Sequence, residues 1–241
     1  MDLFSLTWTA LREAVAAVPD DAFEGPSGCA GWRIRDLVAH LVIDAQDVLI
    51  TLSTPADDAP TADALSYWTP RPTTWPVEAT SDGGAADVDP LDALVVRLAT
   101  AYGEPALLHH HLEDLGAAAG RAALLAHPEL PVATQGMSLT VRDYLQAYVL
   151  EWTLHHLDLV AEAASADSAG IVGAGVPGPP AEGLAAARRM LERRIRLALP
   201  EEWSDADALR IATGRRAPSS AERADLDRLG PRAAMLPLSL G

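Results

Sequence analysis

The chain has 241 residues and a formal net charge of −16, and 49% of its residues are hydrophobic. That length suffices for one large domain, or for one domain with a small appendage, around a sizeable core. The negative charge argues against nucleic acid and anionic membranes as partners, because both are polyanions. A lone cysteine, Cys29, excludes an intramolecular disulfide. Neither a secretory signal pattern nor an apolar stretch of about 18 residues is found, so we expect a soluble, cytoplasmic protein.

The helical periodicity of the apolar residues predicts four long helices. Their ranges are 5–18, 33–53, 91–117 and 140–164. Pro105 lies inside the third range and should kink or split that helix, because proline lacks a backbone donor and clashes with the preceding turn. Thr140 and Asp143 form a capping pattern at the start of the fourth range. Four long helices with two long connectors predict a four-helix bundle with ligands facing inward.

The two long connectors differ in composition. Residues 54–90 are rich in proline and are predicted to form a long loop with a short helix at residues 62–68. Residues 165–180 are rich in glycine, proline, serine and alanine and are predicted to be a linker. This linker divides the chain into a bundle, residues 1–165, and a small C-terminal region, residues 181–241.

The C-terminal region is predicted to contain one helix and one strand. The helix covers residues 181–198, and the arginines near its end suit the negative end of the helix dipole. The strand covers residues 208–213 and is closed by Gly214. The expected fold is therefore mainly α, with a small C-terminal α/β appendage beside the bundle.

Three side chains on two of the predicted helices suggest a metal site. Glu151 and His155 lie four residues apart in an apolar pattern, so they share one helix face. A carboxylate on an apolar wall is costly unless it is paired, and a divalent metal can pair with both carboxylate oxygen and neutral imidazole nitrogen. His40, in a similar setting, offers a third ligand. Three protein ligands leave an open position for water or substrate, which is typical of a catalytic metal site.

Carboxylates flank the three predicted ligands. Asp36 and Asp44 lie four residues before and after His40, so either could accept a hydrogen bond from its ring and orient it. Asp158 lies three residues after His155 and continues the same helix face. We predict that Asp36 and Asp158 support the metal ligands.

A weak internal repeat links the two helices that carry these residues. Residues 33–37 and 140–144 have similar sequences. In that register Asp44 falls on Glu151, whereas no histidine of the fourth helix falls on His40. The two helices are therefore predicted to start alike while presenting their ligands one turn apart.

The remaining histidines and the cysteine have simpler interpretations. Residues 109–111 are three consecutive histidines that point in three directions on a helix, and we interpret them as a solvated helix end. His156 points about 100° away from His155 and is interpreted as a packing or hydrogen-bonding residue. Cys29 precedes a helix N-terminus, where a thiol can be acidified, but we interpret it as an inert small hydrophobe.

A pattern across the two predicted metal-bearing helices resembles the mycothiol-dependent maleylpyruvate isomerase family, part of the DinB-like metal-binding superfamily. The pattern is Trp32-x-x-x-Asp36-x-x-x-His40-Leu41, followed by Glu151-x-x-x-His155-x-x-Asp158. The resemblance covers roughly residues 5–165 as a DinB-like bundle and, more loosely, the tail. It implies that His40, Glu151 and His155 hold zinc, or another divalent metal such as nickel or iron.

The resemblance also implies a chemistry. Members of this family use mycothiol as a thiol co-substrate, so the expected activity is thiol-dependent isomerisation or S-transfer on a small electrophilic or unsaturated substrate. The reaction would proceed through a zinc-bound thiolate in the cytoplasm of an actinobacterium. Arg215, in the segment that looks like the family's C-terminal strand and turn, is implied as the catalytic residue that anchors a substrate carboxylate.

Two other functions are compatible with the same residues. The open metal position could activate water, which would make the protein a metal-dependent hydrolase. Alternatively, the fold could serve as a non-catalytic DinB-like binding module. The residues that bind the thiol and the choice between monomer and homodimer are not fixed by the sequence.

Overall fold

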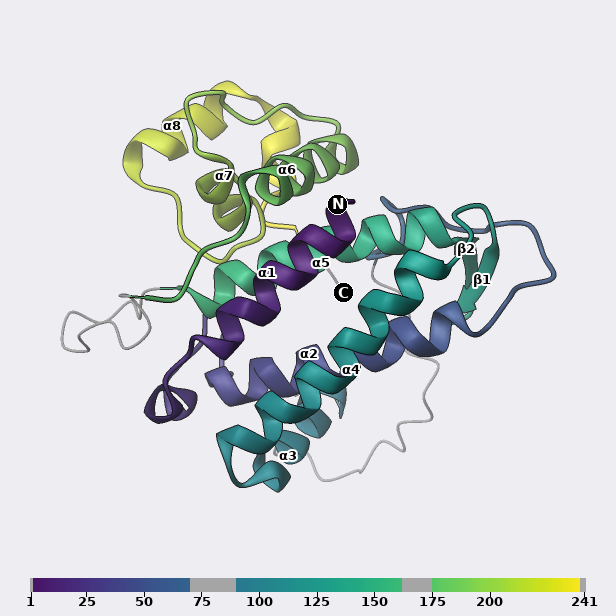
Figure 1. The fold of residues 1–241 in the computed structure, drawn as a ribbon. Helices are drawn as coiled ribbons and strands as arrows, with labels where there is room; N and C mark the ends of the chain where they lie inside the picture. The colour runs from purple at the N-terminus through teal and green to yellow at the C-terminus, as the bar shows by residue number, and fades with distance from the viewer. Residues whose placement is uncertain (1, 70–89, 162–174, 239–241) are drawn as a thin grey trace, which may run out of the picture.

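The computed structural model describes residues 2–69, 90–161 and 175–238 of the chain. These residues are mainly helical, and none of their helices is both long and apolar enough to cross a membrane. Four helices form the central bundle (Figure 1): α1 (Leu3–Ala16), α2 (Ile34–Leu52), α4 (Pro105–Leu125) and α5 (Val141–Leu159). A short 3-10 helix η1 (Asp20–Glu24) follows α1, and α3 (Pro90–Tyr102) packs on α2 and α4. The predicted mainly α bundle is confirmed.

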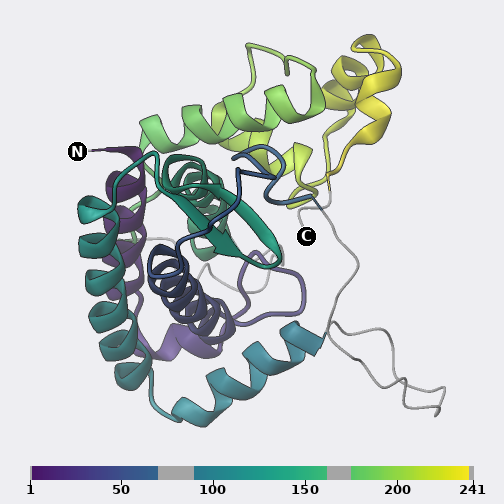
Figure 2. The same cartoon turned by 90° about the vertical axis from the view of Figure 1, so that its right-hand side faces the viewer.

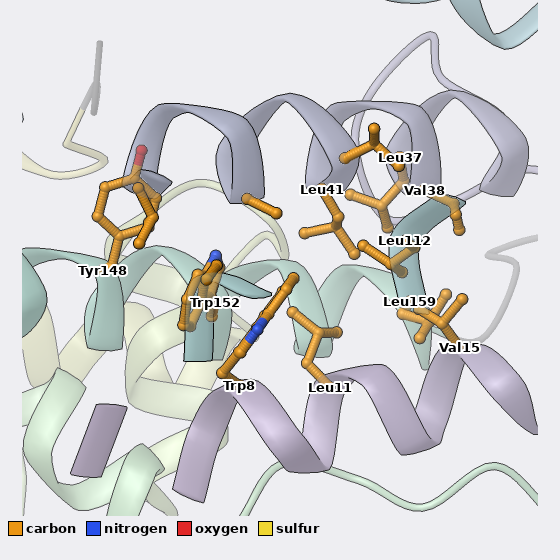
Figure 3. Close-up of a cluster of buried hydrophobic side chains, with 14 of the residues drawn as sticks. Trp8, Leu11, Val15, Leu37, Val38, Leu41, Leu112, Tyr148, Trp152 and Leu159 are labelled. Carbon is orange, nitrogen blue, oxygen red and sulfur yellow. The ribbon is translucent and has the colours of Figure 1, made fainter. Parts of the chain in front are cut away.

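The bundle core is formed by the apolar faces that the sequence periodicity predicted. Trp8 from α1 stacks on Trp152 from α5, with their ring centroids 4.0 Å apart, and both rings are buried. Leu37 and Leu41 from α2 point at the same core from the opposite side (Figure 3). Each fully buried side chain of this size contributes about 1.5–3 kcal/mol relative to exposure in water.

The C-terminal helices lie together on one side of the bundle (Figure 1, Figure 2). They are α6 (Ala181–Ile195), α7 (Asp205–Ala212), α8 (Ser220–Arg228) and the 3-10 helix η2 (Pro231–Met235). Helices α6 and α7 contact α5, which is covered by α1 and α2 as well. Leu150, Leu154 and Leu157 of α5 belong to the same hydrophobic cluster as the buried residues of α6 and α7. Helix α5 is therefore buried on nearly all of its faces.

The strand predicted at residues 208–213 is wrong, because this segment lies mostly in α7. Ser204 caps α7, and its side chain accepts a hydrogen bond from the backbone N–H of Asp207. The buried residues of α7 follow a helical spacing, and they face α6 and α5. Short apolar runs do not distinguish strand from helix by periodicity alone, and the capping serine was the missed signal. Among the described residues the appendage is helical.

A β-hairpin was missed, and one short helix was wrongly predicted. Strands β1 (Pro131–Thr134) and β2 (Met137–Thr140) pair antiparallel across a two-residue turn. Gln135 and Gly136 in that turn both have positive φ, at 49° and 73°, as in the turns that favour Asn-Gly. The helix predicted at residues 62–68 is only a turn, in which Asp63 accepts hydrogen bonds from the backbone of Ser66 and Tyr67. Residues 70–89 of the predicted loop and 162–174 of the linker region lie outside the described residues.

Two local predictions about helix ends are confirmed. Pro105 splits the predicted third helix, because α3 ends at Tyr102 and α4 begins at Pro105, where a missing N–H costs no intrahelical hydrogen bond. Thr140 caps α5, accepting a hydrogen bond from the backbone N–H of Asp143 at 3.1 Å. Helix α5 consequently starts at a defined residue, which fixes the register of Glu151 and His155.

Candidate metal centre

The three predicted ligands from α2 and α5 meet in the structure. Glu151 Oε1 lies 2.8 Å from His155 Nε2 and 3.5 Å from His40 Nε2. The two imidazole rings are edge to face, with centroids 4.8 Å apart. Glu151 and His155 share a face of α5 because they are one turn apart. Contact between α2 and α5 brings His40 to them, which sequence spacing could not show.

Asp44 is the fourth residue of this cluster. It lies one turn after His40 on α2, and its Oδ2 is 3.6 Å from His40 Nε2. Ligand-type atoms of His40, Asp44, Glu151 and His155 all lie within 4.8 Å of one another. Asp44 Oδ2 is buried without a hydrogen-bond partner among the described residues. The sequence held a signal for this residue, since Asp44 falls on Glu151 in the internal repeat.

Burial and mutual electrostatic interactions shift the pKa values of three groups in this cluster. Burial raises the pKa of Asp44 to about 6, although His40 opposes the rise. Burial also works against ionisation of Glu151, but His155 and His40 outweigh it and hold the pKa of that carboxyl below its ordinary value. Burial alone would lower the pKa of His155, but Glu151 outweighs it and raises that pKa well above its ordinary value. Two carboxylates and two imidazoles in one buried place form a donor set that suits a divalent cation.

Asp158 connects the cluster to the C-terminal region. Its Oδ2 lies 3.2 Å from His155 Nδ1, on the side of the ring opposite Glu151. Arg215, in the segment after α7, donates from Nε to Asp158 Oδ1 at 2.8 Å and from Nη2 to Oδ2 at 2.9 Å. If a metal replaced the proton on His155 Nε2, the remaining proton would lie on Nδ1, facing Asp158. Asp158 therefore orients both the predicted ligand and the predicted substrate-binding arginine.

Asp36 has a different position from the one that sequence spacing suggested. Its carboxylate accepts a hydrogen bond from the backbone N–H of Arg33 at 2.8 Å, in the capping box of α2. The carboxylate that approaches His40 is Asp44, one turn further along α2. Of the two carboxylates flanking His40, the structure therefore places the later one in the cluster.

Cys29 lies beside the cluster, which its interpretation from the sequence did not predict. Its Sγ is 3.2 Å from Asp158 Oδ2 and 3.7 Å from His155 Nδ1. Burial raises the pKa of this thiol, although His155 opposes the rise. The raised pKa disfavours the reactive thiolate, as expected for an inert thiol, although the contacts of Sγ with Asp158 and His155 are polar rather than apolar. Its only sequence signal was its place four residues before Arg33, the cap of α2.

The other histidines take part in packing and local hydrogen bonds. His109 packs on Phe23, and His111 Nδ1 bonds to the hydroxyl of Tyr102. His156 Nε2 lies 2.8 Å from the carbonyl oxygen of Pro177, as expected for a hydrogen-bonding residue. None of these three belongs to a convergent group of metal-ligand side chains within the described parts of the chain.

Comparisons with known proteins identify the family and the fold. Residues 4–160 match the model of a family described as the mycothiol maleylpyruvate isomerase N-terminal domain. A solved structure, the crystal structure of a histidine-to-alanine mutant of the mycothiol-dependent maleylpyruvate isomerase, superposes with a TM-score of 0.53 at 18% sequence identity. That alignment covers 89% of this chain and 88% of the solved one, so the similarity of fold extends beyond the bundle. A search of curated proteins gave no match.

Proposed function

Since the chain belongs to the mycothiol maleylpyruvate isomerase family, a family of isomerase enzymes, we propose that it catalyses a mycothiol-dependent cis–trans isomerisation of a small unsaturated acid at a divalent metal centre. The observation that carries the proposal is the convergence of His40, Glu151 and His155 from two helices. S-transfer from the same thiol to a small electrophile is the closest variant of this chemistry.

The side chains present fit a metal. Two imidazole nitrogens and two carboxylates converge, and one buried carboxylate oxygen, Asp44 Oδ2, has no hydrogen-bond partner in the described part of the chain. A buried carboxylate oxygen without a hydrogen bond is costly unless a cation or donor faces it, and His40 Nε2, at 3.6 Å, is beyond hydrogen-bond distance. We propose zinc, held by His40, Glu151 and His155, with Asp44 beside them. When bound, the metal supplies a Lewis acid that lowers the pKa of a bound thiol.

Asp158 and Arg215 supply the second half of the proposed site. Asp158 engages Nε and Nη2 of the guanidinium and holds it in one orientation near His155. A guanidinium has five N–H donors, so the Nη1 donors can still receive a substrate carboxylate. Burial works against the charged form of Arg215, but the ion pair with Asp158 outweighs it and raises the pKa of the guanidinium. We propose that Arg215 positions the carboxylate of the substrate beside the thiol.

The first test is the metal content of the untagged protein. We expect about one zinc per chain, and we expect it to be lost in both His40→Ala and Glu151→Ala. His110→Ala, which removes a histidine of α4 outside the cluster, is the matched control and should retain the metal. A wild-type protein without metal, even after zinc is added, would contradict the metal centre.

The second test separates the proposed reaction from hydrolysis. Cis–trans isomerisation of maleylpyruvate should require added mycothiol, and Arg215→Ala should lower kcat/KM by about 100-fold or more while zinc is retained. Turnover of a substrate without any thiol would instead support a hydrolase that uses metal-bound water.

A further inference from the structure

A surface pocket lies beside the candidate metal centre, in the loop between η1 and α2. Its volume is about 330 Å³, at the small end of the range for ligand sites. Its lining includes Glu24, Ser27, Cys29, Trp32 and Arg33. None of these residues is a metal ligand in the proposed function.

Two lining residues also contact the metal cluster. The ring centroid of Trp32 is 5.2 Å from that of His40, and Cys29 Sγ is 3.7 Å from His155 Nδ1. The pocket and the metal centre are therefore separated by no more than one side chain. A ligand with one end at the metal could lay its other end against Trp32.

The loop that forms the pocket is held in place by backbone hydrogen bonds. The backbone N–H of Ser27 donates a hydrogen bond of 3.0 Å to the carbonyl oxygen of Trp32. The N–H of Gly28 donates to the carbonyl of Asp158 at 2.8 Å, which ties the loop to α5. A pocket fixed in this way needs little ordering when a ligand binds, so less binding free energy is lost.

The polar groups at the rim suit a polyhydroxylated ligand. Arg33 and Arg35 both form ion pairs with Glu24, and the Glu24 and Arg33 side chains are more than half exposed. The rim thus offers an acceptor and donors side by side, beside the half-buried ring of Trp32. A sugar or cyclitol presents many hydroxyl groups to such charges, and a C–H face to an aromatic ring.

We propose that this pocket binds the sugar-like part of mycothiol while the sulfur of mycothiol lies at the metal centre. The inference rests on the proposed function for the identity of the thiol. It adds the residues that select this thiol over others: Trp32 as the stacking surface, and Glu24 with Arg33 as the hydrogen-bonding rim.

S-methylmycothiol is the probe that isolates the pocket from the chemistry, because its sulfur is blocked. Isothermal titration should show that wild-type protein binds it, and that Trp32→Ala weakens binding about tenfold or more, with Trp32→Phe in between. Arg33→Ala should also weaken binding. Arg142→Ala removes a comparable exposed pair with Glu129 on the bundle and should leave binding unchanged. Zinc content is measured in each variant, because Trp32 touches His40.

A second experiment compares the enzyme kinetics with mycothiol and with N-acetylcysteine, a thiol that carries no sugar. KM for mycothiol should rise in Trp32→Ala and Arg33→Ala, whereas KM for N-acetylcysteine should match that of the wild type. The proposed mycothiol pocket would be wrong if S-methylmycothiol bound equally to all variants, or did not bind to the wild type at all. If the wild type then still had full mycothiol-dependent isomerase activity, the proposed function would stand. Trp32-dependent binding without zinc or isomerase activity would support the pocket and sink the proposed function.

Discussion

Asp44 is the residue whose role the structure changes most. It lies in the cluster with one oxygen that has no hydrogen-bond partner among the described residues, and burial raises the pKa of its carboxyl to about 6. If a cation normally faces this oxygen, Asp44→Asn should weaken zinc binding about 10- to 100-fold, the range for groups that support a metal. The affinity can be measured by competition with a chromophoric chelator.

Asp47→Asn is the control for this prediction. Asp47 lies on the same helix but accepts hydrogen bonds from Tyr144 and Tyr148, both at 2.8 Å. Its replacement should lower stability without changing zinc affinity. Equal zinc affinity in wild type and Asp44→Asn would show that Asp44 has no part in metal binding.

Gly28 is required for the close approach of the pocket loop to α5. A Cβ at this position would lie 2.7 Å from the Cα and 2.9 Å from Oδ1 of Asp158. Because the nearest atom is backbone, Gly28→Ala must shift the loop or the end of α5. We expect a loss of about 1–3 kcal/mol in the free energy of unfolding, together with weaker zinc binding.

Gly178→Ala provides the comparison for the glycine variant. A Cβ added there meets nothing within 4 Å, and its φ lies outside the left-handed range. Urea unfolding of the two variants should therefore separate the steric effect at Gly28 from the general effect of replacing glycine. Similar stabilities for the two would argue against a tight contact at Asp158.

At the scale of single elements, α8 gives a prediction that depends on pH. Glu222 completes the capping box with Ser219 and forms two hydrogen bonds with Arg216, at 2.7 and 3.0 Å. Pairing with Arg216 lowers the pKa of Glu222 from 4.5 to about 2. An acid with a depressed folded-state pKa stabilises the fold above its unfolded pKa, and this contribution is lost as the pH falls through the folded value.

The stability difference between wild type and Glu222→Gln should therefore be constant from neutral pH down to about 4.5, the ordinary pKa of the carboxyl. Below that pH the stability difference should shrink, because Glu222 becomes protonated first in the unfolded wild-type chain. It should disappear once Glu222 is protonated in the folded protein as well. Urea unfolding at a series of pH values measures the difference directly. A difference that stays constant at the lowest accessible pH would show that the ion pair does not shift this group.

The elements that sequence predicted correctly are those fixed by local chemistry. Proline at position 105 and the hydroxyl of Thr140 act within one turn of their own residues, so the sequence contains the whole cause. Helix α7 and the hairpin at residues 131–140 were missed, because a short apolar run and a Gln-Gly turn are weak local signals. Likewise, spacing placed Glu151 and His155 on one face, but only packing of α2 on α5 decides whether Asp36 or Asp44 meets them.

At the scale of the whole molecule, the C-terminal region shares a core with the bundle. Sequence predicted residues 1–165 and 181–241 as separate units. Leu150, Leu154 and Leu157 of α5 nevertheless lie in one hydrophobic cluster with buried residues of α6 and α7, and Arg215 bonds to Asp158 across the same boundary. The candidate metal centre has two of its residues on α5, and Arg215 of the C-terminal region pairs with Asp158 beside it, so the geometry of the site depends on both regions.

This shared core predicts that the chain unfolds in one cooperative transition. Leu154 is 1% exposed, and Leu154→Ala should lower the free energy of unfolding by about 2–5 kcal/mol, as is usual for a buried leucine. Leu41→Ala, in the core of the bundle itself, should have a similar effect. In both variants, tryptophan fluorescence and far-ultraviolet circular dichroism should report the same urea midpoint. Two midpoints, with only the lower one moved by Leu154→Ala, would instead mean that the C-terminal helices unfold independently. Arg215 could then leave the candidate metal centre while the bundle stays folded.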